Sequence, residues 1–448
     1  DSTGKATFTV DASINSVNIG KGANSVAGNT VLGESALDSS VTGAGNTAIG
    51  KNSLSANTSG GSNTAVGIDA LRSNTTAFAN TAVGQAALRT NTTGQNNTAV
   101  GASGVLRFNT SGTNNTVVGN GAMYQNTTGT QNTAIGANAL DANTTADNNT
   151  AVGYVSLTTN STGTENTAIG SGALFSNTTG DGNTAIGREA LVNNTTADNN
   201  TAVGLDSLKA NTTGAENTAV GRIALDANTT GSDNVAIGNA ALTSATTASN
   251  NTAVGSRSLL TNTTGTANTA VGHDSLEANT TANNNSAFGF EALKANTTGS
   301  ENTGVGGFAL DANSTGTNNT AVGVNALGAN TTASNNTAMG LSALLLNTTG
   351  ANNVAVGAFA VDANTTASNI TGVGMNALSS NTTGESNNAL GSHALQNNTT
   401  GTRNNAFGVS ALQLNTTGND NSAFGQLALT ANTTGGQNTA VGSLSLDA

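Results

Sequence analysis

The chain has 448 residues with no Pro, Cys or Trp, and only 3% of them are aromatic and 8% charged. Such a composition excludes the single aromatic-rich core of an ordinary domain of this length, and the lack of Cys excludes disulfides, thiolate nucleophiles and Cys-based metal sites. The formal net charge of −12 argues against nucleic-acid binding, and the longest apolar runs, such as Leu344–Leu346, are too short to insert into a membrane.

Residues 1–28 differ from the rest of the chain. "ATFTV" (Ala6–Val10) alternates as a strand does, and "NSVNIGKGANSVAG" (Asn15–Gly28) is a 14-residue version of a motif that follows. We predict that residues 1–28 form an N-terminal cap or a junction to a preceding shaft.

Residues 29–448 repeat one motif. The Gly of "NTAVG" recurs 25 times from Gly33 to Gly442 at a spacing of 17 residues, with a single spacing of 18. The extra residue lies in "GASGVLRFN" (Gly101–Asn109), where we predict a bulge. The consensus is N-T-A-V-G-x-x-A-L-x-x-N-T-T-(G/A)-x-x, numbered here as positions 1–17. A fixed short period of this kind is typical of a repeat architecture.

The residue types at each position predict an all-β fold. Short apolar pieces bounded by Gly, Asn and Thr indicate strands and turns, so one repeat predicts one coil of a parallel β-solenoid of the β-roll type. About 25 coils at about 4.8 Å each would give a rod on the order of 120 Å. The Gly at position 5 suits a positive φ or a close backbone approach. We expect Asn at positions 1 and 12 to adopt left-handed turns and to form amide ladders between coils.

Alternation along the strand leads to a prediction about assembly. Position 4 is always apolar, whereas position 3 is Ala in 21 repeats; position 9 is Leu apart from Met123 and Val361, and position 8 is small apart from Val105. Neighbouring strand residues face opposite ways. We therefore expect Val and Leu to face inward and a long Ala stripe to face outward, and the stripe to be covered in a homotrimer.

The motifs resemble known fibre families. "NSVNIGKGANSVAG" and the "NTAVGxxAL" units are similar to the β-roll heads of trimeric autotransporter adhesins, and the longer unit with "NTTG" is similar to the repeat regions of bacteriophage tail fibres and bacterial surface fibres. The resemblance covers residues 15–448 and implies a trimeric extracellular fibre. In such fibres a self-cleaving C-terminal chaperone domain is often lost. Because the chain starts at Asp1 and stops within a repeat, we expect a processed chain or a fragment of a longer one.

The sequence offers no catalytic or metal-binding constellation. His273 and His393 lie at variable positions in distant repeats, and the acidic residues are scattered in the same way. Examples are Asp141, Glu165, Asp181, Glu189 and Glu216. We expect them to be solvated surface charges, and we expect no enzyme activity, cofactor or metal. "GNDNSAFG" (Gly418–Gly425) is an isolated approximation to a calcium-binding nonapeptide.

The Asn-Thr-Thr cluster allows two further hypotheses. Most repeats contain an Asn-x-Ser/Thr glycosylation acceptor, but modification at every coil would block ladder packing, so we expect the Asn to serve a structural ladder instead. Ice binding by rows of Thr is disfavoured, because a T-x-T pattern is absent, and a lack of thermal hysteresis at millimolar protein would exclude it.

We therefore expect a rigid, multivalent segment of an extracellular attachment fibre of a virion or a bacterial surface. Two alternatives remain open. One is an adhesin head that binds host matrix or glycan through the variable positions. The other is a self-polymerising extracellular filament in which Ala6–Val10 pairs with the next subunit.

Overall fold

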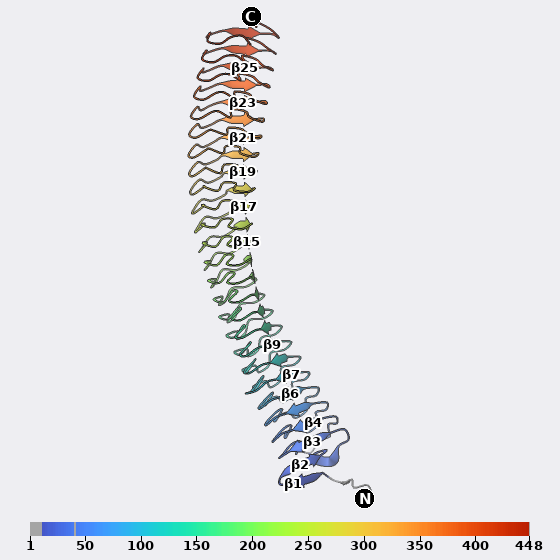
Figure 1. Cartoon of the computed structure of the whole chain (residues 1–448). Coiled ribbons are helices and arrows are strands. Elements are labelled where there is room, and N and C mark those ends of the chain that lie inside the picture. The colour runs from blue at the N-terminus through green and yellow to red at the C-terminus, as the bar shows by residue number, and fades with distance from the viewer. Residues whose placement is uncertain (1–10, 40–41, 448) are drawn as a thin grey trace. The chain divides into compact units, whose positions relative to one another are not determined.

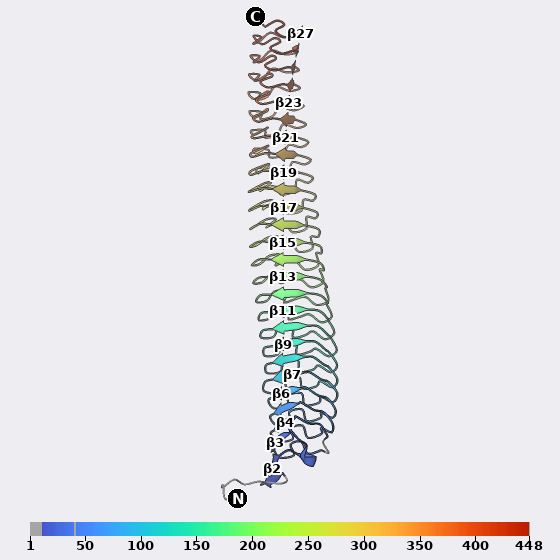
Figure 2. The same cartoon turned by 90° about the vertical axis from the view of Figure 1, so that its right-hand side faces the viewer.

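The computed structural model describes residues 11–39 and 42–447, which fall into two compact units that divide after Asn217. Ala6–Val10, predicted as a strand, lies outside the described residues. Each unit is a stack of short strands joined by turns (Figures 1 and 2). The predicted all-β parallel solenoid with a 17-residue turn is confirmed in both units.

The first unit opens with an antiparallel segment. Strand β1 (Ala12–Ile14) pairs antiparallel with β2 (Val17–Gly20), and β2 pairs antiparallel with β3 (Thr30–Gly33). A 3-10 turn, η1 (Ala23–Ser25), lies between β2 and β3. The antiparallel pairing distinguishes residues 11–28 from the parallel repeat that follows. That they form a cap or a junction stays a prediction.

All later pairings that the structure gives for the first unit are parallel and in register. Thr64 of β5 pairs with Thr81 of β6, so identical repeat positions lie side by side. The strands are β4 (Thr47–Ile49), β5 (Thr64–Val66), β6 (Thr81–Val83), β7 (Thr98–Val100), β8 (Thr116–Val118), β9 (Thr133–Ile135), β10 (Thr150–Val152), β11 (Thr167–Ile169), β12 (Thr184–Ile186) and β13 (Thr201–Val203).

The second unit repeats the same arrangement. Its strands are β14 (Thr218–Val220), β15 (Val235–Ile237), β16 (Thr252–Val254), β17 (Thr269–Val271), β18 (Ser286–Phe288), β19 (Thr303–Val305), β20 (Thr320–Val322), β21 (Thr337–Met339), β22 (Val354–Val356), β23 (Thr371–Val373), β24 (Asn388–Leu390), β25 (Asn405–Phe407), β26 (Ser422–Phe424) and β27 (Thr439–Val441). Each pairs in parallel with the next, as Val271 pairs with Phe288.

Backbone hydrogen bonds continue around the coil beyond the strand. At the corner after the strand, the amide of Gly67 donates to the carbonyl of Ile49 one coil back, at 2.8 Å. In the following turn, the amide of Leu71 donates to the carbonyl of Ala87 one coil ahead, at 3.0 Å. Gly67 has a φ of 135°, and a Cβ there would lie 2.5 Å from the carbonyl oxygen of Gly84. Both reasons predicted for an invariant Gly are therefore confirmed.

The interior of each coil is narrow and is filled by positions 1, 3, 8, 9, 12 and 15. From Asn46 to Asn421 the Asn residues at positions 1 and 12 are buried, and they form two ladders, as predicted. In the first ladder, Nδ2 of Asn63 donates to Oδ1 of Asn46 at 3.2 Å; in the second, Nδ2 of Asn74 donates to Oδ1 of Asn57 at 2.9 Å. Buried amides are stable because each finds partners in the next coil.

The prediction of left-handed Asn at positions 1 and 12 is wrong. The left-handed residues lie at positions 7, 9 and 17, as in Asp69 (φ 58°), Leu71 (φ 49°) and Ala79 (φ 57°). A left-handed residue interrupts the alternation of an extended chain. As a result position 8 and the Leu at position 9 both face inward, and Ala70 and Leu71 are both fully buried.

The prediction that position 4 faces inward and Ala outward is also wrong. Ala at position 3 is fully buried, whereas position 4 faces outward, with Ile135 40% and Phe288 42% exposed. The reason is the width of the coil: a Cβ on Gly372, which takes position 3, would lie 2.5 Å from Cγ2 of Val361 at position 9. Position 3 thus lies directly against the position-9 side chain of the preceding coil, where Ala is the usual residue and the buried Val31 and Val117 are the largest.

Candidate functional site

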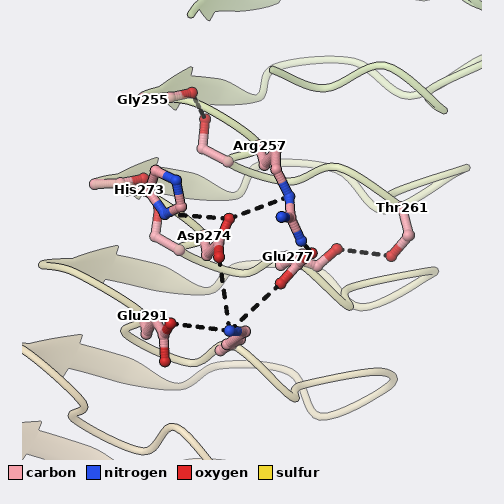
Figure 3. Close-up of polar contacts among 11 residues, drawn as sticks. Gly255, Arg257, Thr261, His273, Asp274, Glu277 and Glu291 are labelled. Atoms are coloured by element: carbon pink, nitrogen blue, oxygen red, sulfur yellow. Dashed lines mark hydrogen bonds and ion pairs between the residues drawn. The ribbon is translucent and has the colours of Figure 1, made fainter. Parts of the chain in front are cut away.

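The charged side chains lie on the outer surface of the turns, at variable positions. Figure 3 shows the largest cluster, which comes from positions 6, 7 and 10 of three successive coils of the second unit. Asp274 is 4% exposed, and its carboxylate lies 3.3 Å from Nε of Arg257 and 3.6 Å from Nζ of Lys294. Glu277 pairs with the same Arg257. A buried carboxylate needs such compensation, so the cluster joins the coils as an ion-pair network.

Two of the contacts in Figure 3 complete this network. Nζ of Lys294 donates a hydrogen bond to Oε1 of Glu291 at 2.9 Å, and this bond raises the pKa of Lys294. Nδ1 of His273 lies 3.3 Å from the carboxylate of Asp274. These contacts link side chains of three successive coils.

The second candidate histidine has different neighbours. Nδ1 of His393 lies 2.8 Å from Oγ of Ser392, and Nε2 lies 3.4 Å from Nδ2 of Asn376. Within the described residues the structure gives His393 no carboxylate partner, so no Ser-His-Asp arrangement forms there.

The five acidic residues singled out from the sequence are not brought together. Glu189 lies 2.7 Å from Nζ of Lys209, whose hydrogen bond lowers the pKa of Glu189. Asp181 accepts hydrogen bonds from the amide and hydroxyl of Thr164, and burial raises the pKa of Asp141. Glu165 and Glu216 lie at position 17. Their positions place them on separate coils.

In Gly418–Gly425, the segment that approximates a calcium-binding nonapeptide, side-chain oxygens of Asn419 and Asp420 accept hydrogen bonds from residues of the preceding coil. The carboxylate of Asp420 accepts two hydrogen bonds from Arg403, at 2.7 and 2.9 Å, and this pairing lowers its pKa. Oδ1 of Asn419 accepts from the amide of Thr402 at 2.7 Å. Over residues 11–39 and 42–447 no three His, Cys, Asp or Glu side chains gather as a metal site.

The glycosylation acceptors divide into two groups. Asn143 of "NTT" is fully buried in the ladder, whereas Asn148 of "NNT" is exposed at position 17. The position-13 Thr of the cluster uses its hydroxyl within the stack: Oγ1 of Thr263 donates to the carbonyl of Thr280 at 3.1 Å. The Asn-Thr-Thr motif therefore has a structural role that requires no modification.

We define the outer strand face as the side chains at positions 2 and 4 of β3–β13 and of β14–β27. Its position-4 side chains are those that the sequence predicted to face inward. Position 4 carries Val, Ile, Leu, Met or Phe in every coil, and position 2 carries Thr, Ser, Val or Asn. Neither position carries a charged residue in any coil, although the chain has 24 acidic and 12 basic residues. Phe407 and Phe424 stack with ring centroids 5.1 Å apart on this face.

Comparison with known proteins adds no assignment. No model of a protein family matches the chain, and no curated protein matches it either. Among the described residues no helix has the length and hydropathy to cross a bilayer.

Proposed function

We propose that the chain is a structural segment of an extracellular attachment fibre, in which copies lie side by side along their outer strand faces. The observation that carries this proposal is the row of apolar side chains at position 4 of every coil. Neither position 4 nor position 2, the other outward position of the strand, carries a charged residue in any coil. The row is exposed in part in both units, as at Ile169 (39%) and Met339 (44%).

The size of this face supports a partner. In the second unit 14 strands present it. With strands about 4.8 Å apart and outward residues about 6.6 Å apart, the strip of positions 2 and 4 covers about 450 Å², of which about half comes from the apolar side chains at position 4. Apolar patches of a few hundred Å² mark interaction sites on soluble proteins, since leaving them in water is unfavourable.

The shape of the face favours a second copy as the occupant. The strip is two residues wide and repeats at every strand, so a globular partner would cover only a few coils of it. A parallel copy of the chain presents the same spacing and would make the same contact at each coil. Three copies are the simplest closed assembly for a side-by-side fibre, in line with the resemblance to phage tail fibres and trimeric autotransporter adhesins.

In this proposal the chain performs no chemistry. Its in-register ladders resist bending, and several copies held in one fibre raise the effective concentration of a receptor-binding tip at a host surface. We place such a fibre outside the cell, on a virion or a bacterial surface. The second candidate function is an adhesin head in which this chain binds glycan directly, because the first unit contains the cavity described in the next subsection. The filament joined through Ala6–Val10 depends on residues outside the described part.

The test is the mass in solution by light scattering. The wild-type chain is expected to form an oligomer, most simply three times 43.4 kDa. A variant with Phe288→Glu, Met339→Glu and Leu390→Glu places charges on the outer strand face of the second unit and is expected to be monomeric, with an unchanged β spectrum. A monomeric wild type, or an unchanged mass in the variant, would overturn the proposal.

The matched control places the same three charges on another side of the coil. Thr281, Thr332 and Thr383 occupy position 14 of the same region and are exposed. Their replacement by Glu is expected to leave the oligomer intact. This separates the effect of the outer strand face from that of added negative charge.

A further inference from the structure

The one 18-residue coil opens a cavity in the first unit. Its volume is about 420 Å³, within the range of small-molecule sites. The lining residues are Asp69, Gln85, Ala86, Arg89, Ser103, Gly104, Arg107 and Tyr124. Gly104 lies in this coil; it has a φ of 78°, and a Cβ there would lie 3.0 Å from both Cδ of Arg107 and Cε2 of Tyr124. The insertion and the absence of a side chain at Gly104 therefore leave the space open.

The charge of this cavity is opposite to that of the chain. Arg89 and Arg107 line the cavity, and Arg72, one coil before Arg89, lies next to it without lining it; among the described residues Asp69 is the one carboxylate paired with them. Oδ2 of Asp69 lies 3.6 Å from Nε of Arg89, and Oδ1 lies 3.9 Å from Nη1 of Arg72. A local excess of positive charge in a chain of net charge −12 favours an anionic ligand.

Arg107 is held in place without a carboxylate partner in the described residues. Its Nη1 donates to the hydroxyl of Tyr124 at 3.0 Å, and its Cζ lies 5.4 Å from the ring centroid of Phe108 and 5.8 Å from that of Tyr124. Its Nε is buried and has no hydrogen-bond partner. Because a buried donor without a partner is costly, an acceptor oxygen that reached this nitrogen would remove an unfavourable term.

We infer that this cavity binds a carboxylated sugar, independently of whether the chain assembles into a fibre. Guanidinium groups bind carboxylates through paired hydrogen bonds, which Arg89 and Arg107 supply. The ring of Tyr124 offers an apolar surface for one face of a sugar, and Gln85 and Ser103 offer donors and acceptors for its hydroxyls. A bare inorganic anion would use the arginines alone and leave these other groups without a role.

The test is a titration with sodium glucuronate, monitored by calorimetry or NMR, with glucose, acetate and sulfate as comparison ligands. Millimolar binding of glucuronate is expected, with at least tenfold weaker binding of glucose and acetate. Arg107→Ala should weaken binding at least tenfold. Asp69→Asn should strengthen it severalfold, because it frees Arg89 from the carboxylate that it pairs with among the described residues. The control is Arg188→Ala, whose side chain is 60% exposed and pairs with Glu189 and Asp206, and which should change nothing.

The outcomes are distinct. No glucuronate binding at 50 mM, equal binding by the wild type and Arg107→Ala, or equal binding of glucose would overturn the inference, and sulfate binding as tight as glucuronate would reduce the site to a simple anion site. The same titration on the three-glutamate variant of the outer strand face separates the two proposals. The cavity should bind in that variant even though it no longer assembles.

Discussion

At the scale of single residues, buried asparagine takes the place that large apolar side chains hold in an ordinary core. Each ladder amide is bonded to the next coil, so the interior is polar yet satisfied. One natural break shows how a ladder adapts. Ile370 replaces Asn at position 1, and Nδ2 of Asn387 in the next coil keeps the ladder's usual bond to the carbonyl 14 residues ahead, that of Gly401 at 2.7 Å, and also donates to the carbonyl of Gly384 at 3.0 Å.

Asn319→Ala should test how much one step of the amide ladder contributes to the unfolding free energy. Asn319 donates to Asn302 and to the carbonyl of Ala333, and its Oδ1 accepts from the amide of Asn336 at 3.0 Å. Removing the amide leaves buried partners unpaired, so we expect a loss of about 1–3 kcal/mol in unfolding free energy, measured by urea denaturation. Thr332→Ala, at an exposed position, is the control and should be neutral.

Asp362→Asn should stabilise the fold at neutral pH. Burial raises the pKa of Asp362 above 3.8 in the folded state, so the folded chain binds more protons than the unfolded one, and wild-type stability falls as pH rises through the folded pKa. The variant lacks this loss. We expect a gain of less than about 1 kcal/mol at pH 7, since the group is half solvated, and no gain below pH about 3. A gain that persists at low pH would contradict this cause.

At the scale of the coil, the sequence predicted the period, the parallel register, the glycine corner and the amide ladders, because each follows from stacking one repeat on its copy. It did not predict which face of the strand points inward. Val at position 4 is more apolar than Ala at position 3, and hydrophobicity alone favours burying Val. The decisive factor is space, since the Leu at position 9 already fills the interior opposite the strand.

Gly323→Ala should show how closely the coils approach. A Cβ on Gly323 would lie 2.4 Å from the carbonyl oxygen of Gly340, at a φ of 138°. We expect a loss of about 3 kcal/mol or more, seen as a lower urea midpoint. Gly307→Ala is the matched control, because its Cβ would meet only the carbonyl oxygen of Phe290, at 4.0 Å. An equal effect of both substitutions would show that crowding at the corner is not the cause.

At the scale of the whole molecule, the ion-pair networks and the arginine-lined cavity were not visible in the sequence. Their members lie about one coil apart in the chain, as do Asp274 and Lys294, and only the stacking brings them together. A signal was present in hindsight: opposite charges recur at positions 7 and 10 of neighbouring repeats, and three arginines occupy position 10 in succession. The 18-residue spacing predicted a bulge, but it did not predict the cavity.

Deleting Val235–Asn319 should shorten the chain without changing its fold. These 85 residues are five whole repeats within the second unit, so the remaining coils keep their register. We expect an unchanged β spectrum per residue, an oligomer of proportionally lower mass, and unchanged glucuronate binding. Deleting Val235–Ser314, which is 80 residues, is the control and should disrupt the stack because it breaks the period. Loss of assembly after the 85-residue deletion would argue against a spacer.

The side-by-side assembly is tested most directly by thiol accessibility. Because the chain has no Cys, an introduced Cys is the only thiol that can be labelled. A single Val305→Cys reports on the outer strand face, where the native side chain is 36% exposed. Maleimide should label this thiol at least tenfold more slowly in the wild-type background than in the three-glutamate background, while Thr315→Cys at position 14 labels equally fast in both. Equal labelling of Val305→Cys in the two backgrounds would show that nothing covers this face.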